Sequence, residues 1–139
     1  MFRAHSWKGV SIGAQAPEEV TAYIEIVPTD TVKYEVDKVS GFLKVDRPQR
    51  FPNYCPVYYG LVPQTYCSDG VAALFAARTK RTGIVGEADP LDLSVLTAKT
   101  IPHSDILLTA LTIDGFRTAA GGEAHAKTIS QEDPRGRNW

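Results

Sequence analysis

Three β-prone segments follow one another between residues 20 and 46, and they constrain the fold of this chain more than any other feature. Segments 20–27, 31–37 and 42–46 are rich in β-branched and aromatic side chains, and turn-forming residues separate them. Strands joined by such short connections usually pair antiparallel, so we expect a three-stranded meander. Residues 48–66 contain four prolines and four tyrosines, which favours extended segments and edge turns over a central strand or a helix.

The second half of the chain adds further strands after one interruption. "VAALFAAR" is the only good helix-forming run, and it predicts a short helix inside an insertion at 68–86. Segments 91–97 and 105–113 predict strands, "FRTAA" and "AKTIS" are weaker candidates, and "DG" at 114–115 is a hairpin signal. Short strands at regular spacing predict a small closed or half-closed β-barrel.

Length and charge limit the domain count and the classes of partner. The 139 residues are enough for one domain, which we expect to be a barrel at 1–130 followed by an irregular tail at 131–139. The 15 basic and 16 acidic residues give a net charge of −1, which argues against nucleic acid or an anionic membrane as a partner. Without a leader-like or membrane-spanning segment we expect a cytoplasmic protein, in which Cys55 and Cys67 are free thiols.

Acidic residues stand at positions where they need an explanation. Glu25 lies between two isoleucines of a predicted strand, where a buried carboxylate without a partner would be costly. Glu87, Asp89 and Asp92 fall within six positions, and such clustered carboxylates either have raised pKa values or hold a cation. Pro90 restricts this loop, and the arrangement suits Mg²⁺. "DPLD" read alone is equally well explained as a solvated turn before a strand.

The basic candidates are Lys33, Lys44, Arg47 and Lys127. Lys33 shares a strand face with Glu35 and Asp37, a pattern that a simple solvated face also explains. Arg47 ends its predicted strand, from which its guanidinium could bind phosphate through two parallel hydrogen bonds. Lone basic residues at strand ends are usually surface charges, so only their combination with the acidic cluster indicates a metal and phosphate site.

Three segments of the chain resemble, in the same order, segments of the soluble family I inorganic pyrophosphatases, and they are most similar to the chlamydial-type members. These segments are "IEIVPTDTVKYEVDKVSGFLKVDRP", "CPVYYGLVPQTY" and "DPLDLSVL". The resemblance runs from about residue 20 to about residue 118 and continues more weakly to Ile129. It implies a mainly β fold: an OB-like five-stranded barrel whose acidic groove binds several Mg²⁺ ions and one pyrophosphate. It also implies that water attacks one phosphorus atom of the pyrophosphate.

The resemblance assigns roles to nine residues. Asp89 resembles the carboxylate that accepts a proton from the attacking water, and Tyr59 and Glu35 resemble supporting catalytic groups. Lys33, Arg47 and Lys127 resemble the phosphate ligands. Glu25, Glu87 and Asp92 resemble the metal ligands, with Asp92 shared between two metal ions.

The chain also departs from the family pattern. Glu87 replaces an aspartate, Cys55 replaces a tyrosine, and Ala120 and His125 stand where the family has two metal-binding aspartates. Glu123 could replace one of these carboxylates in part. The sequence ends before the family's tyrosine-lysine pair and its C-terminal helix, so no such helix is expected, and a truncated or decayed gene copy would explain this.

Two hypotheses follow. The first is a magnesium-dependent inorganic diphosphatase, weakened by the missing ligands. The alternative is a catalytically inactive relic of the fold that serves as a phosphate-binding or interaction module. A mixed Cys/His metal site of Cys55, Cys67, His103 and His125 matches no trusted zinc spacing. Family relatives are often hexamers or dimers, which leaves a homo-oligomer open.

Overall fold

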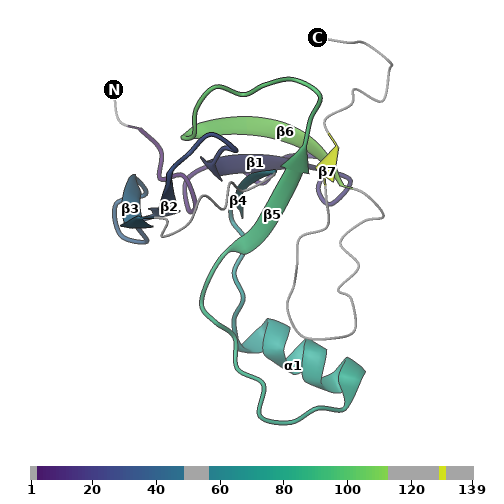
Figure 1. Ribbon diagram of the computed structural model, residues 1–139. Coiled ribbons are helices and arrows are strands. Elements are labelled where there is room, and N and C mark those ends of the chain that lie inside the picture. Colours follow the sequence, from purple (N-terminus) through teal and green to yellow (C-terminus); the bar gives the residue numbers. More distant parts are fainter. Residues whose placement is uncertain (1–2, 49–56, 113–128, 131–139) are drawn as a thin grey trace.

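A computed structural model describes residues 3–48, 57–112 and 129–130 of the chain. Five strands close a barrel in the order β1-β4-β5-β7-β6, and β2 and β3 form a separate hairpin (Figure 1). The elements are β1 (Glu19–Ile26), β2 (Val32–Val36), β3 (Leu43–Pro48), β4 (Tyr58–Val62), α1 (Asp69–Thr79), β5 (Leu91–Leu96), β6 (Ile106–Thr112) and β7 (Ile129–Ser130). The predicted five-stranded barrel with one short helix in an insertion is therefore present.

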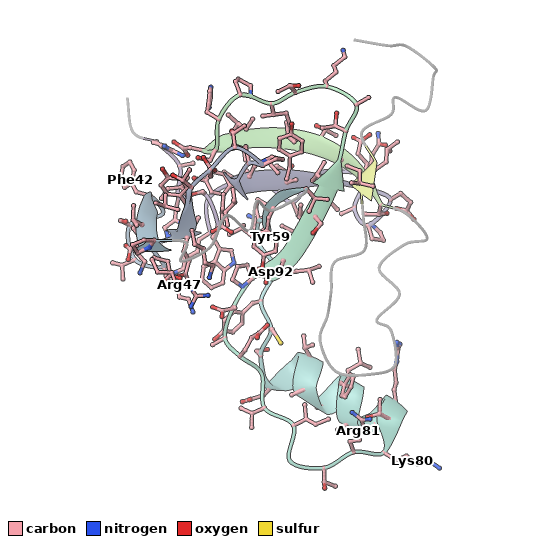
Figure 2. The ribbon with its side chains drawn as sticks, viewed as in Figure 1. Phe42, Arg47, Tyr59, Lys80, Arg81 and Asp92 are labelled. Atoms are coloured by element: carbon pink, nitrogen blue, oxygen red, sulfur yellow. The ribbon has the colours of Figure 1, made fainter. Side chains whose placement is uncertain are left out.

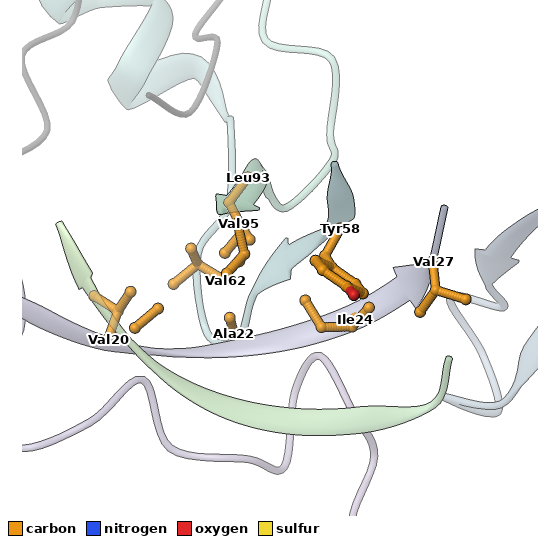
Figure 3. Close-up of a cluster of buried hydrophobic side chains, with 9 residues drawn as sticks. Val20, Ala22, Ile24, Val27, Tyr58, Val62, Leu93 and Val95 are labelled. Carbon is orange, nitrogen blue, oxygen red and sulfur yellow. The ribbon is translucent and has the colours of Figure 1, made fainter. Parts of the chain in front are cut away.

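The barrel interior is filled by residues that alternate along its strands. Val20, Ala22 and Ile24 of β1 point to one face, as residues two apart on a strand must. They pack with apolar side chains from the other strands, as Figure 3 shows. These partners are Val27, Tyr58, Val62, Leu93, Val95 and Ala110. The inward positions of β1, β4, β5 and β6 thus make one core.

The outer face of β1 is also buried. Tyr23 packs there with Trp7, Val36 and Leu61, which come from the N-terminal segment, β2 and β4. Both faces of the strand are therefore covered, and only Glu19 and Thr21 of β1 are partly exposed. A strand that is buried on both sides tolerates few polar residues, which makes Glu25 conspicuous.

The predicted meander is wrong at its first connection. β2 pairs antiparallel with β3, as expected from their short turn, but neither strand pairs with β1. β1 instead pairs antiparallel with β4 and with β6, so both of its edges are occupied by strands from later in the chain. The β2–β3 hairpin is left to pack against the barrel rather than to extend its sheet.

The prediction that residues 48–66 hold no central strand is also wrong. β4 lies between β1 and β5 in the barrel. The four prolines of this segment stand at 48, 52, 56 and 63, outside the five residues of β4, so none of them removes a backbone donor from the ladder. The prediction failed because it used the composition of the whole segment, in which the proline-free stretch of β4 is only a short part.

The predicted helix and later strands are confirmed. α1 contains the "VAALFAAR" run, has Asp69 in its first turn and Arg78 in its last, and ends at Lys80 with φ 57°. Figure 1 shows α1 standing apart from the barrel strands, and Ala72 is its only buried residue. β5 and β6 match the predicted segments, β7 falls within "AKTIS", and Cys67 is a free thiol.

The remaining expectations lie outside the described residues. They concern Cys55, "FRTAA", the "DG" turn and the tail at 131–139. In the part of the chain that the structure describes, no helix has the length and apolar character needed to cross a membrane.

Gly60 allows β4 to approach β1 closely, which generates a stability prediction. A Cβ at this position would lie 1.9 Å from the Tyr23 carbonyl oxygen, so Gly60→Ala must displace backbone. We expect Gly60→Ala to lower the free energy of unfolding by about 3 kcal/mol. Gly70→Ala is the matched control, because its Cβ would meet only the Ser68 hydroxyl at 3.8 Å and alanine favours the helix. Equal urea unfolding midpoints for the two variants would contradict this account.

Candidate functional site

The outer face of β1, β4 and β5 carries the polar side chains that the inner face lacks. Leu61 of β4 lies opposite Tyr23 of β1 and Asp92 of β5, so these three residues form one row across the sheet. Tyr59 lies on the same outer face, two positions along from Leu61. Glu25 stands at a register irregularity between Ile24 and Ile26, from which its side chain reaches the Val36 N–H of β2 and interacts with the charge of Asp92. Alternation therefore places Tyr59 and Asp92 outside the barrel, and the irregularity in β1 accompanies the placement of Glu25 on the same side.

Glu25 is a buried carboxylate with one backbone partner. Its side chain accepts a hydrogen bond of 2.7 Å from the Val36 backbone N–H, which links β1 to β2. Burial raises the pKa of Glu25 to about 7, and the negative charges of Asp92 and Glu35 act in the same direction. The Val36 hydrogen bond and Lys33 oppose the rise without cancelling it. The charge of an ionised Glu25 is therefore only partly compensated by its neighbours.

Asp92 shares this electrostatic environment. Partial burial raises the pKa of Asp92, and Asp89 and Glu35 add to the rise, whereas a hydrogen bond from Tyr59 and the charge of Lys33 lower it. Figure 2 shows Tyr59 and Asp92 close together on β4 and β5. Five of the predicted residues belong to one electrostatic cluster, namely Glu25, Lys33, Glu35, Tyr59 and Asp92.

The β2–β3 hairpin supplies the positive charge. Lys33 and Arg47 are directly paired across the two strands, next to an irregularity in the register after Lys33. Asp46 lies 3.3 Å from the Lys33 Nζ and 3.9 Å from the Arg47 Nε. The Arg47 side chain is largely exposed, so its guanidinium is free to turn toward an anion. The other sequence candidate, Lys44, lies 3.8 Å from Asp37 near the hairpin turn.

Asp89 lies in the loop before β5 and is held there by main-chain hydrogen bonds. Its carbonyl oxygen accepts from the Cys67 N–H at 2.8 Å, and the Ala88 N–H donates to the Cys67 carbonyl at 3.0 Å. The Asp89 carboxylate forms an ion pair with Lys38, which also raises the pKa of that lysine. Asp89 acts electrostatically on Asp92, so the predicted base lies beside the cluster.

Lys38 was missed by the sequence reasoning. It follows Asp37 in the hairpin turn, where a lysine is an ordinary exposed residue. No spacing connects positions 38 and 89, and only the packing of the hairpin against the barrel brings their charges together. The sequence offered only a weak indication that Lys38 belongs to the site, namely that it is a basic residue next to a strand that carries Lys33 and Glu35.

Glu87 is the described candidate that the structure does not bring to the cluster. Its side chain is exposed, and no ion pair joins it to another described residue. Ala88, with φ 61°, turns the chain between Glu87 and Asp89. The positions of Lys127, Ala120, Glu123 and His125 lie outside the described residues.

The described residues contain no group of side chains that could enclose a metal ion. Among residues 3–48, 57–112 and 129–130, no three or more His, Cys, Asp or Glu side chains form a group that could hold one, and this includes Cys67 and His103. A hydrated cation such as Mg²⁺ takes fewer carboxylates, because it keeps several waters. Glu25 and Asp92 interact electrostatically, so they are carboxylates that could contribute to such a site.

Comparison with known proteins gives a consistent result. A family model described as "Inorganic pyrophosphatase" matches residues 22–138. An inorganic pyrophosphatase of Chlamydia muridarum is 47% identical over 126 residues, which are 91% of this chain and 60% of that protein. A soluble inorganic pyrophosphatase of Oryza sativa is 42% identical over 138 residues, which are 98% of this chain and 56% of that protein.

Solved structures agree with these relatives. The inorganic pyrophosphatase of Thermus thermophilus superposes with a TM-score of 0.58 at 26% identity, covering 77% of this chain and 51% of that chain. An inorganic pyrophosphatase of Coxiella burnetii gives 0.55 at 32% identity, covering 74% and 50%. The barrel is therefore of the pyrophosphatase type, and the chain spans about 60% of the length of the chlamydial relatives. With 117 consecutive positions matched by the family model (22 to 138 inclusive), the chain belongs to the inorganic pyrophosphatase family.

Proposed function

We propose that this chain is a magnesium-dependent inorganic diphosphatase that hydrolyses pyrophosphate to two phosphates in the cytoplasm. The observation that carries the proposal is the cluster of Glu25, Glu35 and Asp92 around Lys33 on the outer face of the barrel. Carboxylates that lack full compensation suit divalent cations, and the adjacent lysine suits phosphate. Family membership supports pyrophosphate as the phosphate compound. We further propose one barrel domain at 1–130 and an irregular tail at 131–139.

Glu25 and Asp92 are the described residues that would hold magnesium, and Glu87 is the third candidate if its loop rearranges. When bound, magnesium neutralises phosphate charge and acidifies water. Asp92 interacts electrostatically with Glu25 and Glu35, whereas Glu87 does not belong to this cluster, so we expect Glu87 to contribute less to metal affinity than Asp92. Tyr59 orients Asp92 through its hydrogen bond, which keeps this carboxylate ionised and available.

Asp89 accepts the proton of the attacking water in the proposed reaction. A bond forms between the water oxygen and one phosphorus, and the bond from that phosphorus to the bridging oxygen breaks. The electron pair of the broken bond leaves with the second phosphate, and both products are inorganic phosphate. Lys38 forms an ion pair with the Asp89 carboxylate and so restricts its position, as a general base requires.

Lys33 and Arg47 bind the phosphate groups in this proposal, and Lys127 is a third ligand inferred from the sequence. The paired positions of Lys33 and Arg47 place both positive charges at one end of the hairpin. Glu35 supports the reaction from within the same cluster, since its charge and that of Lys33 both act on Asp92. Positive groups held on a rigid hairpin stabilise the charge that develops on the leaving phosphate.

The alternative, an inactive relic that binds phosphate or a partner, rests on Ala120 and His125. Both positions lie outside the described residues, so the structure offers nothing in its favour. Activity measurements decide between the two functions.

The first prediction concerns the proposed base. Asp89→Asn keeps the size of the side chain and removes its basicity, so we expect kcat for pyrophosphate hydrolysis to fall by about 10² to 10⁴-fold. Phosphate release is measured across a magnesium titration from zero to saturation. Asp69→Asn, an exposed aspartate at the start of α1, is the matched control and should keep the wild-type rate. Wild-type phosphate release no faster than that of Asp89→Asn would support the relic.

The second prediction concerns the pH dependence of stability without metal. The folded protein holds a proton on Glu25 up to about pH 7, whereas the unfolded chain releases it near 4.5. The folded state therefore binds more protons between these values, and stability falls as the pH rises through this window, by about 3 kcal/mol. Urea midpoints measured in a chelator between pH 4.5 and 8 test this.

Glu25→Gln is the matched variant for this experiment, because glutamine keeps an acceptor for the Val36 N–H and has no proton to lose. We expect it to flatten most of the pH dependence, and Asp92, which is shifted in the same direction, accounts for the remainder. Magnesium added at pH 8 should restore stability to the wild type and much less to Glu25→Gln. Parallel pH profiles for the two proteins would overturn the assignment.

The third prediction concerns the two family positions that lack a carboxylate. Restoring both in Ala120→Asp with His125→Asp should lower the magnesium concentration needed for half-maximal rate by about 10-fold or more. The magnesium dependence of phosphate release measures the change. Ala119→Asp with Ala126→Asp adds the same charge at neighbouring positions and serves as the control. Equal effects of the two pairs would show that charge alone, not ligand position, matters.

A further inference from the structure

We propose that the N-terminal turn, residues 5–8, is a positioning element for the Asp89 loop, residues 87–91, and that it reaches this loop along two routes. The turn lies before the region matched by the family model, 22–138. The hydrogen bonds of its side chains go to residues other than Asp89 and Asp92, so its members act through other residues. The kinetic part of the proposal rests on the proposed function, and the structural part does not.

The turn is itself a built structure. The His5 Nδ1 accepts hydrogen bonds of 3.2 Å from the N–H groups of Trp7 and Lys8, so the proton of the neutral ring is on Nε2. The Gly9 N–H donates to the His5 carbonyl at 2.8 Å. The Trp7 ring is 7% exposed and packs with Tyr23, Val36 and Leu61. The turn is therefore anchored in the outer core of the barrel.

The first route runs from Trp7 through Thr65. The Trp7 Nε1 donates to the Thr65 carbonyl at 2.7 Å, and the Trp7 carbonyl accepts from the Gln64 N–H at 2.8 Å. The Thr65 hydroxyl donates to the Val62 carbonyl and accepts from the Leu91 N–H at 2.8 Å. Leu91 is two residues after Asp89, so this route fixes the main chain where the loop enters β5.

The second route runs through the hairpin turn. The Lys38 carbonyl accepts from the Lys8 Nζ at 3.0 Å and is 3.3 Å from the His5 Nε2. The Ser6 hydroxyl donates to the Gly41 carbonyl. Gly41, with φ +75°, lies so close to His5 that a Cβ would be 2.7 Å from its ring. Lys38 in turn forms the ion pair with the Asp89 carboxylate.

The two routes meet at one residue from opposite sides. Leu91 and Cys67 hold the main chain around Asp89, and Lys38 holds its carboxylate. A general base must be held within a fraction of an ångström of its working position, and a small displacement costs about 10²-fold in rate. Trp7, Thr65 and Lys38 are therefore positioning residues for the proposed base.

The kinetic test uses Trp7→Phe, which keeps an aromatic ring in the outer core and removes the N–H that binds Thr65. We expect kcat to fall by about 10-fold or more with KM nearly unchanged, because substrate-binding residues are not displaced. Tyr58→Phe is the matched control. It also removes one hydrogen bond from a buried aromatic residue, but in that bond the Tyr58 hydroxyl accepts from the Ile101 N–H at 3.0 Å, between β5 and β6.

The structural test does not depend on activity. Hydrogen exchange in Trp7→Phe should accelerate about 5-fold or more at the amides of Leu91 and Cys67, while the β1–β6 ladder keeps its protection. Thr65→Val, which lacks the hydroxyl, should reproduce both effects. Thr65→Ser keeps the hydroxyl and should restore most of the protection and of the rate. This pair remains informative if Trp7→Phe folds poorly.

The outcomes separate the two proposals. If the wild-type protein is inactive but the variants show faster hydrogen exchange only in the Asp89 loop, the positioning element is upheld and the diphosphatase proposal is rejected. Exchange that accelerates equally in the loop and in the β1–β6 ladder would overturn the positioning element, whatever the activity. In an active wild type, a rise in KM with unchanged kcat, or an equal loss of kcat in Tyr58→Phe, would overturn it as well.

Discussion

The hydrogen bond from the Val36 N–H to the Glu25 carboxylate is the contact on which the arrangement of the site depends. It fastens the β2–β3 hairpin to the outer face of β1, although the two share no ladder. A buried carboxylate is costly, and one backbone donor offsets only part of that cost, so Glu25 retains a raised pKa. The same contact brings Lys33 and Glu35 of β2 within electrostatic range of Asp92 on β5.

Strand alternation lets one set of strands serve both stability and chemistry. The inward residues of β1, β4 and β5 form the barrel core, and the outward residues carry Glu25, Tyr59 and Asp92. The insertion that contains α1 joins β4 to β5 and stands apart from the barrel. The Asp89 loop ends this insertion, so it needs separate support, which Cys67, Thr65 and Lys38 provide.

The individual elements were predictable because they depend on neighbours in the sequence. β2, β3, β5, β6 and α1 fall where residue type and turn signals place them. The meander and the exclusion of a strand from 48–66 failed for different reasons. Both edges of β1 are taken by distant strands, and β4 is too short to dominate the composition of a proline-rich segment. Lys38, Trp7 and Thr65 escaped notice because their roles arise from contacts across 26 or more positions.

The sequence by itself determined which residue types could perform the chemistry: an acid within a β-prone segment, clustered aspartates before a strand, and basic residues on a hairpin. It did so because secondary-structure propensity and alternation act over a few residues. Only the tertiary structure decided that Glu25 is buried, that Glu87 is exposed, and that Lys38 meets Asp89. Burial and charge pairing depend on which distant segments share a face, and closure of the barrel makes that selection.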